Sequence, residues 1–320
     1  MPANRLRQVT SGGAKVLHLP VGQNAAPSSR SALLNEEPPI ISDLAGQTQW
    51  GGRTHAGIEW EVYRGDSHSV LAGFSPESFS SIVTSPPYYW QRDYKVGGQI
   101  GQETTIAGYV NSIANVMDQA RRVLCREGLL FLNLGDTYYS AKGQPKGVDR
   151  KNGARRFGLR AVDASGLGVP RKTAIGIPWR VALEMIGRGW ILRSPIVWRR
   201  EGFLPEPTAK DRPWRSYEMV FMFSKSPRYH FKREALGSDE DVWTISDRPS
   251  KSRGGHSAAF PDQLVEKCLS IGCPVKGRVL DPFAGSGTVA RVALESGRPA
   301  TAVELNPEFC EHIAASLKEL

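Results

Sequence analysis

Hydrophobic and polar residues alternate along several short segments of the chain, in the pattern of β-strands. Residues 59–63 alternate like a strand, residues 80–84 are predicted to be a second short strand, and the apolar run at 129–132 is typical of a buried strand. Similar segments recur later in the chain, so the pattern predicts seven strands in all. They lie at residues 59–63, 80–84, 129–132, 190–198, 217–223, 278–281 and 300–304.

Segments with a helical period separate these strands. Apolar residues recur every three to four positions between 109 and 123, and helices are also predicted at 178–186 and 288–295. A regular succession of strands and helices is typical of a sheet with mostly parallel strands. We therefore expect an α/β fold with helices on both faces of the sheet.

A last helix is predicted after the final strand. Asn306 is the expected N-cap, and Pro307 suits the first turn because its missing N–H has no partner there. The apolar residues that follow at helical spacing should face the core. They are Phe309, Ile313 and Leu317.

One large domain behind a flexible N-terminal arm is expected. The chain has 320 residues, 40% of them hydrophobic, which is enough to bury one large core. Residues 1–55 are rich in Ser, Gly, Pro, Asn and Gln and lack a sustained period, so we predict a mobile arm at 1–55 and a folded domain at 56–320. No run approaches the ~20 apolar residues of a membrane helix, and no apolar signal core is found at the N-terminus. A cytoplasmic protein is predicted.

The four cysteines do not form a CxxC pair. Cys268 and Cys273 lack a second pair of metal ligands, so reduced thiols are expected and a metal site is not.

The chain is basic, with 41 Lys and Arg against 32 Asp and Glu and a pI near 9.5. Such a balance attracts polyanions, including nucleic acid. Positive charge is concentrated in the glycine-rich segment 141–172, which is either a solvated loop or an insertion that orders against DNA phosphates. The candidate DNA contacts in it are Lys142, Lys146, Arg150, Lys151, Arg155 and Arg156.

A second candidate DNA-reading insertion spans residues 199–255. Arginine and aromatic residues are interleaved at its start, which suits combined contact with phosphates and bases. The alternative is a surface loop held in place by its tryptophans. The candidate DNA contacts are Arg199, Arg200, Arg212, Trp214 and Arg215.

The C-terminal part of the chain contains a candidate cofactor site. A strand ending at Asp281 runs into a glycine turn and a helix, whose first N–H groups and close backbone approach suit a ligand. Glu304 closes the next strand, where a carboxylate can accept both hydroxyls of a ribose. The lone Gly-x-Gly fits an adenosyl ligand better than a pyrophosphate, although a plain strand-to-helix turn is the alternative. The candidate residues in the turn are Asp281, Pro282, Phe283, Gly285, Ser286, Gly287 and Thr288.

The segment Ser85-Pro86-Pro87-Tyr88 follows the second predicted strand and is a candidate catalytic loop. Two prolines fix the backbone and hold the Ser85 hydroxyl and the Pro86 carbonyl in place. Two such acceptors would bind the hydrogens of an aromatic amino group and make its lone pair available for in-line methyl transfer. Tyr88 would stack on the base, which requires a base flipped out of the duplex.

The two motifs together resemble the S-adenosylmethionine-dependent DNA amino-methyltransferases of the β group, over roughly residues 58–320. In that group the catalytic loop precedes the target-recognition region and the cofactor turn comes last, as it does here. The resemblance implies a Rossmann-like methyltransferase fold with a circularly permuted motif order, S-adenosylmethionine as cofactor and double-stranded DNA as partner. It also implies a homodimer and a place in DNA modification, with or without a restriction partner.

The resemblance assigns roles to further residues. Asp66 is similar to the acid that meets the adenine amino group of the cofactor, and His256 with Phe260 resembles the segment beside its methionine end. Asn306 joins the candidate cofactor-binding set. Trp198 matches an aromatic position near the flipped base, although it could equally be a core tryptophan.

The target base is inferred from the first residue of the catalytic loop. Serine at this position is usual for cytosine-N4 enzymes of the resembled group, and aspartate for adenine-N6 enzymes, so Ser85 favours cytosine. The alternatives are an adenine-N6 enzyme with the same fold and, more distantly, a catalytically silent DNA-binding regulator.

Overall fold

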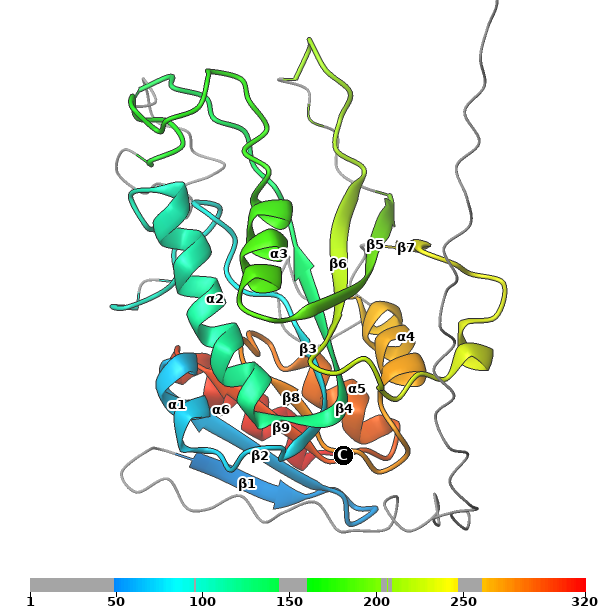
Figure 1. Ribbon diagram of the computed structural model, residues 1–320. Coiled ribbons are helices and arrows are strands. Elements are labelled where there is room, and N and C mark those ends of the chain that lie inside the picture. The colour runs from blue at the N-terminus through cyan, green and yellow to red at the C-terminus, as the bar shows by residue number, and fades with distance from the viewer. Residues whose placement is uncertain (1–48, 95, 144–159, 203–205, 207–208, 247–260) are drawn as a thin grey trace, which may run out of the picture. The chain divides into compact units, whose positions relative to one another are not determined.

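The computed structural model describes residues 49–94, 96–143, 160–202, 206, 209–246 and 261–320, which belong to one compact unit. Figure 1 shows the course of the chain. The strands are β1 (Gln49–Arg53), β2 (Glu59–Arg64), β3 (Phe79–Thr84), β4 (Leu124–Leu134), β5 (Ile191–Glu201), β6 (Tyr217–Ser224), β7 (Val242–Ser246), β8 (Val279–Asp281) and β9 (Ala300–Glu304). The helices are α1 (Ser67–Gly73), α2 (Ile106–Val123), α3 (Ile177–Gly187), the short 3-10 helix η2 (Arg233–Leu236), α4 (Asp262–Gly272), α5 (Thr288–Glu295) and α6 (Pro307–Lys318).

The described strands form a single sheet in the order β1-β2-β9-β8-β3-β4-β6-β5-β7. Its central strands, from β2 to β4, are all parallel, with β3 paired to β8 on one side and to β4 on the other. β6 is antiparallel to both β4 and β5, and β1 is antiparallel to β2. The carboxyl ends of the five parallel strands therefore meet at one edge, the usual place for a ligand in an open α/β sheet.

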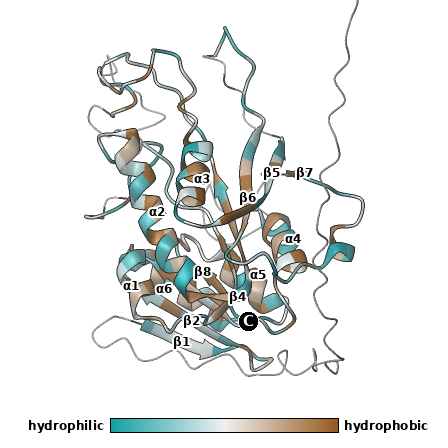
Figure 2. Ribbon diagram, viewed as in Figure 1, coloured by the Kyte–Doolittle hydropathy of each residue, from teal (hydrophilic) through white to brown (hydrophobic). Residues whose placement is uncertain are grey.

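Helices cover both faces of the sheet (Figure 1). α1, α2 and α3 pack on one face against residues such as Leu130 and Phe221, and α4, α5 and α6 pack on the other against residues such as Leu129 and Phe131. Neighbouring residues of β4 thus enter different cores, as expected for a strand buried on both sides. Figure 2 shows the central strands coloured mainly as hydrophobic, whereas β1 is pale.

The predicted parallel α/β architecture is confirmed, but seven strands is wrong: the described sheet has nine. The seven predicted strands are its central ones, and β1 and β7 extend the two edges. β1 has the sequence Gln-Trp-Gly-Gly-Arg and is almost wholly exposed. Backbone pairing with β2 holds it in the sheet, and its side chains bury little surface. It therefore lacks the apolar alternation by which a strand is recognised in a sequence.

Two predicted boundaries change as a result. The arm predicted at 1–55 includes β1, so its last residues belong to the sheet; residues 1–48 lie outside the described part of the chain. The insertion predicted at 199–255 includes β6 and β7, and β7 pairs with β5 from Val197 opposite Val242. Trp243 and Ile245 of β7 are buried, a two-residue period that the sequence does contain.

The other differences concern helices. α1 and α4 are additional to the predicted helices. α6 begins as expected, with the Asn306 side chain accepting a hydrogen bond from the Glu308 backbone N–H. Phe309 was expected in its buried stripe but is only partly buried; Cys310 takes that place in the core, and Phe309 lines a cavity instead. None of the described helices is long and apolar enough to cross a membrane.

Candidate active site

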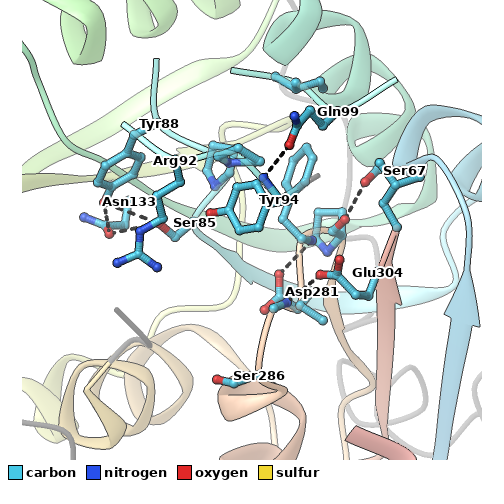
Figure 3. A pocket seen from close by; sticks show the side chains of 18 of the residues that line it. Ser67, Ser85, Tyr88, Arg92, Tyr94, Gln99, Asn133, Asp281, Ser286 and Glu304 are labelled. Atoms are coloured by element: carbon cyan, nitrogen blue, oxygen red, sulfur yellow. Dashed lines mark hydrogen bonds between the residues drawn. The ribbon is translucent and has the colours of Figure 1, made fainter. Parts of the chain in front are cut away.

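A cavity of about 580 Å³ opens at the carboxyl edge of the parallel strands. Its walls come from the segments that follow β2, β3, β8 and β9, from the end of β4, and from the adjoining ends of β5 and β6. The cavity therefore brings the predicted cofactor turn and the predicted catalytic loop together, although almost two hundred residues separate them in the chain. Figure 3 shows Asp281 and Glu304 in one part of the site and Ser85, Tyr88 and Asn133 in another.

Asp281 is buried at the end of β8, where two donors meet one of its oxygens. The Thr84 hydroxyl donates to Oδ1 at 2.7 Å and the Phe283 backbone N–H donates to it at 3.0 Å. Burial raises the pKa of Asp281 from 3.8 to about 7, although both hydrogen bonds act in the opposite direction. The carboxyl group thus links β3 to the glycine turn.

The glycine turn is held by Glu304. The Gly285 N–H donates to Glu304 Oε2 at 2.8 Å, and the Asn306 N–H donates to Oε1 at 2.9 Å. Burial raises the pKa of Glu304, and these backbone donors oppose the rise. Gly287 has φ +81°, and a Cβ there would lie 2.9 Å from Ile313 Cγ2, so the turn packs directly against α6.

Asp66 is the N-cap of α1 and also lines the cavity. Its Oδ1 accepts from the backbone N–H and the hydroxyl of Ser69, both at 2.9 Å. Oδ2 has no hydrogen bond from the described residues. The neighbouring Ser67 hydroxyl donates to the Pro282 carbonyl at 2.6 Å and so fixes this segment against the glycine turn.

The candidate catalytic loop, Ser85 to Tyr88, is anchored by a hydrogen bond from α2. The Tyr109 hydroxyl on α2 donates to the Pro87 carbonyl at 2.9 Å, whereas the Pro86 carbonyl accepts no hydrogen bond from the described residues. The Ser85 hydroxyl lies 3.3 Å from both Tyr88 Oη and Asn133 Oδ1. Ser85 and the Pro86 carbonyl are thus the acceptors of this loop that remain available.

Tyr88 is held by its hydroxyl as well as by its ring. The hydroxyl donates to Glu218 Oε2 at 2.6 Å and lies 2.8 Å from Asn133 Oδ1. The ring packs against Gly135, where a Cβ would come within 2.5 Å of Tyr88 Cε2. Burial raises the pKa of Tyr88 well above its ordinary value, so the hydroxyl keeps its proton. Stacking of this ring on a base stays a prediction.

Several lining residues were missed from the sequence. Asn133 and Glu218 lie inside strands whose pattern is otherwise apolar, so each is a polar residue at a position that predicts burial. That mismatch is the signal that could have found them. The segment after the catalytic loop also lines the cavity; there Gln99 Oε1 accepts from the Tyr94 N–H at 2.7 Å (Figure 3).

Some of the predicted DNA-contacting arginines have partners within the protein. Arg212 donates to Glu206 at 2.7 Å and lies over the Tyr138 ring at 3.8 Å. Arg215 donates to Glu206 at 3.1 and 3.2 Å. Arg200 donates to Glu218 Oε1 at 3.4 Å and lines the cavity. These side chains are only partly exposed.

The remaining predicted site residues lie on the surface, at the cavity or outside the described residues. Arg199, Trp214 and Lys142 are exposed, while Trp198 is buried in the core with part of its surface on the cavity. Ser286 and Thr288 line the cavity with their hydroxyls 3.3 Å apart. The residues outside the described part are Lys146, Arg150, Lys151, Arg155, Arg156, His256 and Phe260.

Comparison with known proteins gives consistent results. Residues 79–316 match the family model described as DNA methylase. The chain is 39% identical over 259 residues to the type II methyltransferase M.Cfr9I of Citrobacter freundii, covering 78% of this chain and 85% of that protein.

Two solved structures resemble the fold. The PvuII DNA methyltransferase (cytosine-N4-specific) superposes with a TM-score of 0.61 and 23% identity, over 82% of this chain and 86% of that one. The M1.HpyAVI–SAM complex gives a TM-score of 0.52 and 16% identity, over 81% and 98%.

Proposed function

The chain belongs to the N6/N4 DNA methylase family, and from that premise we propose that it transfers a methyl group to N4 of cytosine in duplex DNA. The observation that carries the proposal is the single cavity that joins the Ser85–Tyr88 loop to the Asp281–Thr288 turn. A family member that acts on DNA needs both parts, because the base and the methyl donor must meet in one place.

The cofactor is S-adenosylmethionine, and the donor set of the cavity fits it. Glu304, at the end of β9, has its two oxygens oriented by backbone N–H groups and would accept the ribose hydroxyls. Asp66 Oδ2 would accept from the adenine amino group, and Phe283 and Phe309 offer apolar surface. When bound, this cofactor supplies a methyl group on a positively charged sulfur, which keeps the bonding electron pair as the methyl leaves.

The catalytic loop would orient the base. The Ser85 hydroxyl and the Pro86 carbonyl would accept the two hydrogens of the exocyclic amino group, which directs the nitrogen lone pair toward the methyl group. The Tyr109 hydroxyl holds the neighbouring Pro87 carbonyl, so the loop is fixed before the base arrives. Such preorganisation avoids rearrangement during the reaction.

The choice of cytosine rests on Ser85. A hydroxyl at the first position of the loop is the form usual for cytosine-N4 enzymes of this family. Adenine N6 is the second candidate, because the same two acceptors suit its amino group equally well.

DNA would approach over the end of the sheet at which the cavity opens. Arg199, Trp214 and Lys142 are exposed and would contact phosphates or bases. Arg212 and Arg215 would first have to exchange Glu206 for DNA phosphates. The layout of arm and catalytic domain, the other DNA contacts and the homodimer stay predictions.

The test is to incubate the purified protein with mixed-sequence duplex DNA and S-adenosylmethionine, digest the DNA to nucleosides and identify methylated bases by mass spectrometry. We expect N4-methylcytosine. N6-methyladenine would overturn the inference from Ser85, and the lack of any methylated base would overturn the proposal itself. Ser85→Ala should lower the rate by about 100-fold or more while the cofactor still binds. Ser112→Ala on α2, whose hydroxyl donates to the Gly108 carbonyl, is the matched control.

A further inference from the structure

Glu218 places a carboxylate within hydrogen-bond distance of Tyr88 in the catalytic loop. It lies near the start of β6, opposite Trp198 of β5, and lines the cavity. Its Oε2 accepts from the Tyr88 hydroxyl at 2.6 Å and from Asn133 Nδ2 at 3.3 Å. Its Oε1 accepts from Arg200 Nη1 at 3.4 Å. Three side chains from three different segments thus converge on this one group.

The role proposed for Ser85 depends on where its own hydrogen points. A hydroxyl has one hydrogen, and Ser85 presents its lone pairs to an amino group only when that hydrogen is donated elsewhere. The acceptors within reach are Tyr88 Oη and Asn133 Oδ1, both at 3.3 Å. The Tyr88 hydrogen goes to Glu218 Oε2, because a short hydrogen bond to a carboxylate is a strong one. The lone pairs of Tyr88 Oη are then available to accept from Ser85.

We propose that Glu218 is a positioning residue that orients the Ser85 hydroxyl through Tyr88 and receives the proton released by the methylated amino group. The proposal rests on the proposed function, since it concerns the same reaction. Asn133 cannot replace Glu218 as the end of the chain, because an amide oxygen is a poor proton acceptor. Asn133 instead fixes the carboxylate, with Nδ2 shared between Glu218 and the Met219 carbonyl at 3.1 Å.

The proton balance is simple. Methylation leaves the amino nitrogen with one proton in excess, and its N–H bond breaks as that proton passes to Ser85 Oγ. The Ser85 proton passes to Tyr88 Oη and the Tyr88 proton passes to Glu218 Oε2, which becomes a carboxylic acid. Release of this proton to water restores the starting state. Ser85 and Tyr88 are unchanged over the cycle, and no oxidant or reductant takes part.

The variants that test the proposal are Glu218→Gln, Tyr88→Phe and the double variant, with Glu266→Gln on the exposed face of α4 as the matched control. We expect Glu218→Gln to lower the single-turnover rate at saturating DNA by about 100-fold, as for loss of one acid–base group. Tyr88→Phe should have a similar effect, and the double variant should be no slower than the slower single variant. If the rate losses of the two single variants multiply in the double variant, the two residues act independently and the proposal is overturned.

A binding measurement provides a readout independent of turnover. Once sequencing of methylated DNA has identified the target site, the affinity for a duplex with cytosine there is compared with that for a duplex with 2-pyrimidinone, which lacks the amino group and pairs more weakly. The cost of flipping each base is the same for every variant, so a change in the ratio of the two affinities reports the contact with the amino group. Glu218→Gln should shift this ratio toward the 2-pyrimidinone duplex, while Glu266→Gln leaves it as in wild type. A Glu218 variant that keeps the wild-type ratio and the wild-type rate refutes the role.

Failure of the proposal and failure of the proposed function give different results. If wild type methylates no base, the function is wrong. If wild type methylates DNA and Glu218→Gln is as fast, only the Glu218 proposal is wrong. Thermal unfolding of each variant checks that it folds. Tyr88→Phe interrupts the same proposed proton path without a substitution in β6.

Discussion

Replacement of Asp281 by asparagine should remove a large pH dependence of stability. Asp281 is buried at the end of β8, and the two hydrogen bonds from Thr84 and Phe283 both reach Oδ1. An asparagine side chain of the same shape can keep both bonds through its amide oxygen. It cannot ionise, so Asp281→Asn isolates the effect of the buried charge.

The size of the effect follows from the pKa. Burial raises the pKa of Asp281 from 3.8 to about 7. Because the folded-state pKa is the higher one, the favourable contribution of the neutral acid is complete below pH 4 and is lost as pH rises through 7. At ~1.4 kcal/mol per pK unit, ionisation at pH 7.5 lowers the free energy of unfolding by ~4 kcal/mol. The new amide donors add a destabilisation of ~1–3 kcal/mol that does not depend on pH.

Urea unfolding between pH 4 and pH 8 measures this directly. The difference in unfolding free energy between Asp281→Asn and wild type should move by ~4 kcal/mol in favour of the variant from pH 4 to pH 7.5. Asp241→Asn, at an exposed aspartate before β7, should change little over that range. A constant difference between Asp281→Asn and wild type at every pH would refute the reasoning.

Two further predictions concern the support of the site. Gly287→Ala should lower the free energy of unfolding by ~2 kcal/mol or more, measured by urea unfolding, because it places a side chain at φ +81° and 2.9 Å from Ile313 Cγ2; unchanged stability would contradict the close packing on α6. Tyr109→Phe removes the donor to the Pro87 carbonyl, so we expect a stability loss of ~1–2 kcal/mol and slower methyl transfer with unchanged cofactor affinity; a normal single-turnover rate would show that the loop needs no such anchor.

Much of the fold could be predicted from the sequence because the central strands are apolar. The seven predicted strands are the seven central ones of the sheet, and α5 and β9 have the predicted bounds. β1 could not be predicted from its side chains, since two of its five residues are glycines and the strand is held by backbone pairing. Local pattern identifies elements that bury side chains, and it misses elements that bury little.

The lining of the cavity was predictable where a motif is continuous in sequence and less so where it is assembled from separate strands. Ser85 and Asp281 could be proposed as site residues because their neighbours form recognisable loops, and both line the cavity. Glu218 and Asn133 come from β6 and β4, and only the antiparallel pairing of these strands places them together. Arg212 was predicted to contact DNA because arginine and aromatic residues are interleaved in its segment, and that stays a prediction. Its pairing with Glu206, six residues away, could not be inferred from this pattern.

The position of β8 and β9 has a consequence for biosynthesis. These strands lie between β2 and β3 in the sheet, yet they follow β3 by almost two hundred residues in the chain (Figure 1). During synthesis on the ribosome, the edges of β2 and β3 that later pair with β9 and β8 therefore lack their partner strands until the segment 279–304 has been made. Such long-range pairing slows folding and exposes sheet edges to aggregation. The glycine turn belongs to the same late segment, so a nascent chain acquires the proposed cofactor site and the centre of its sheet in one step.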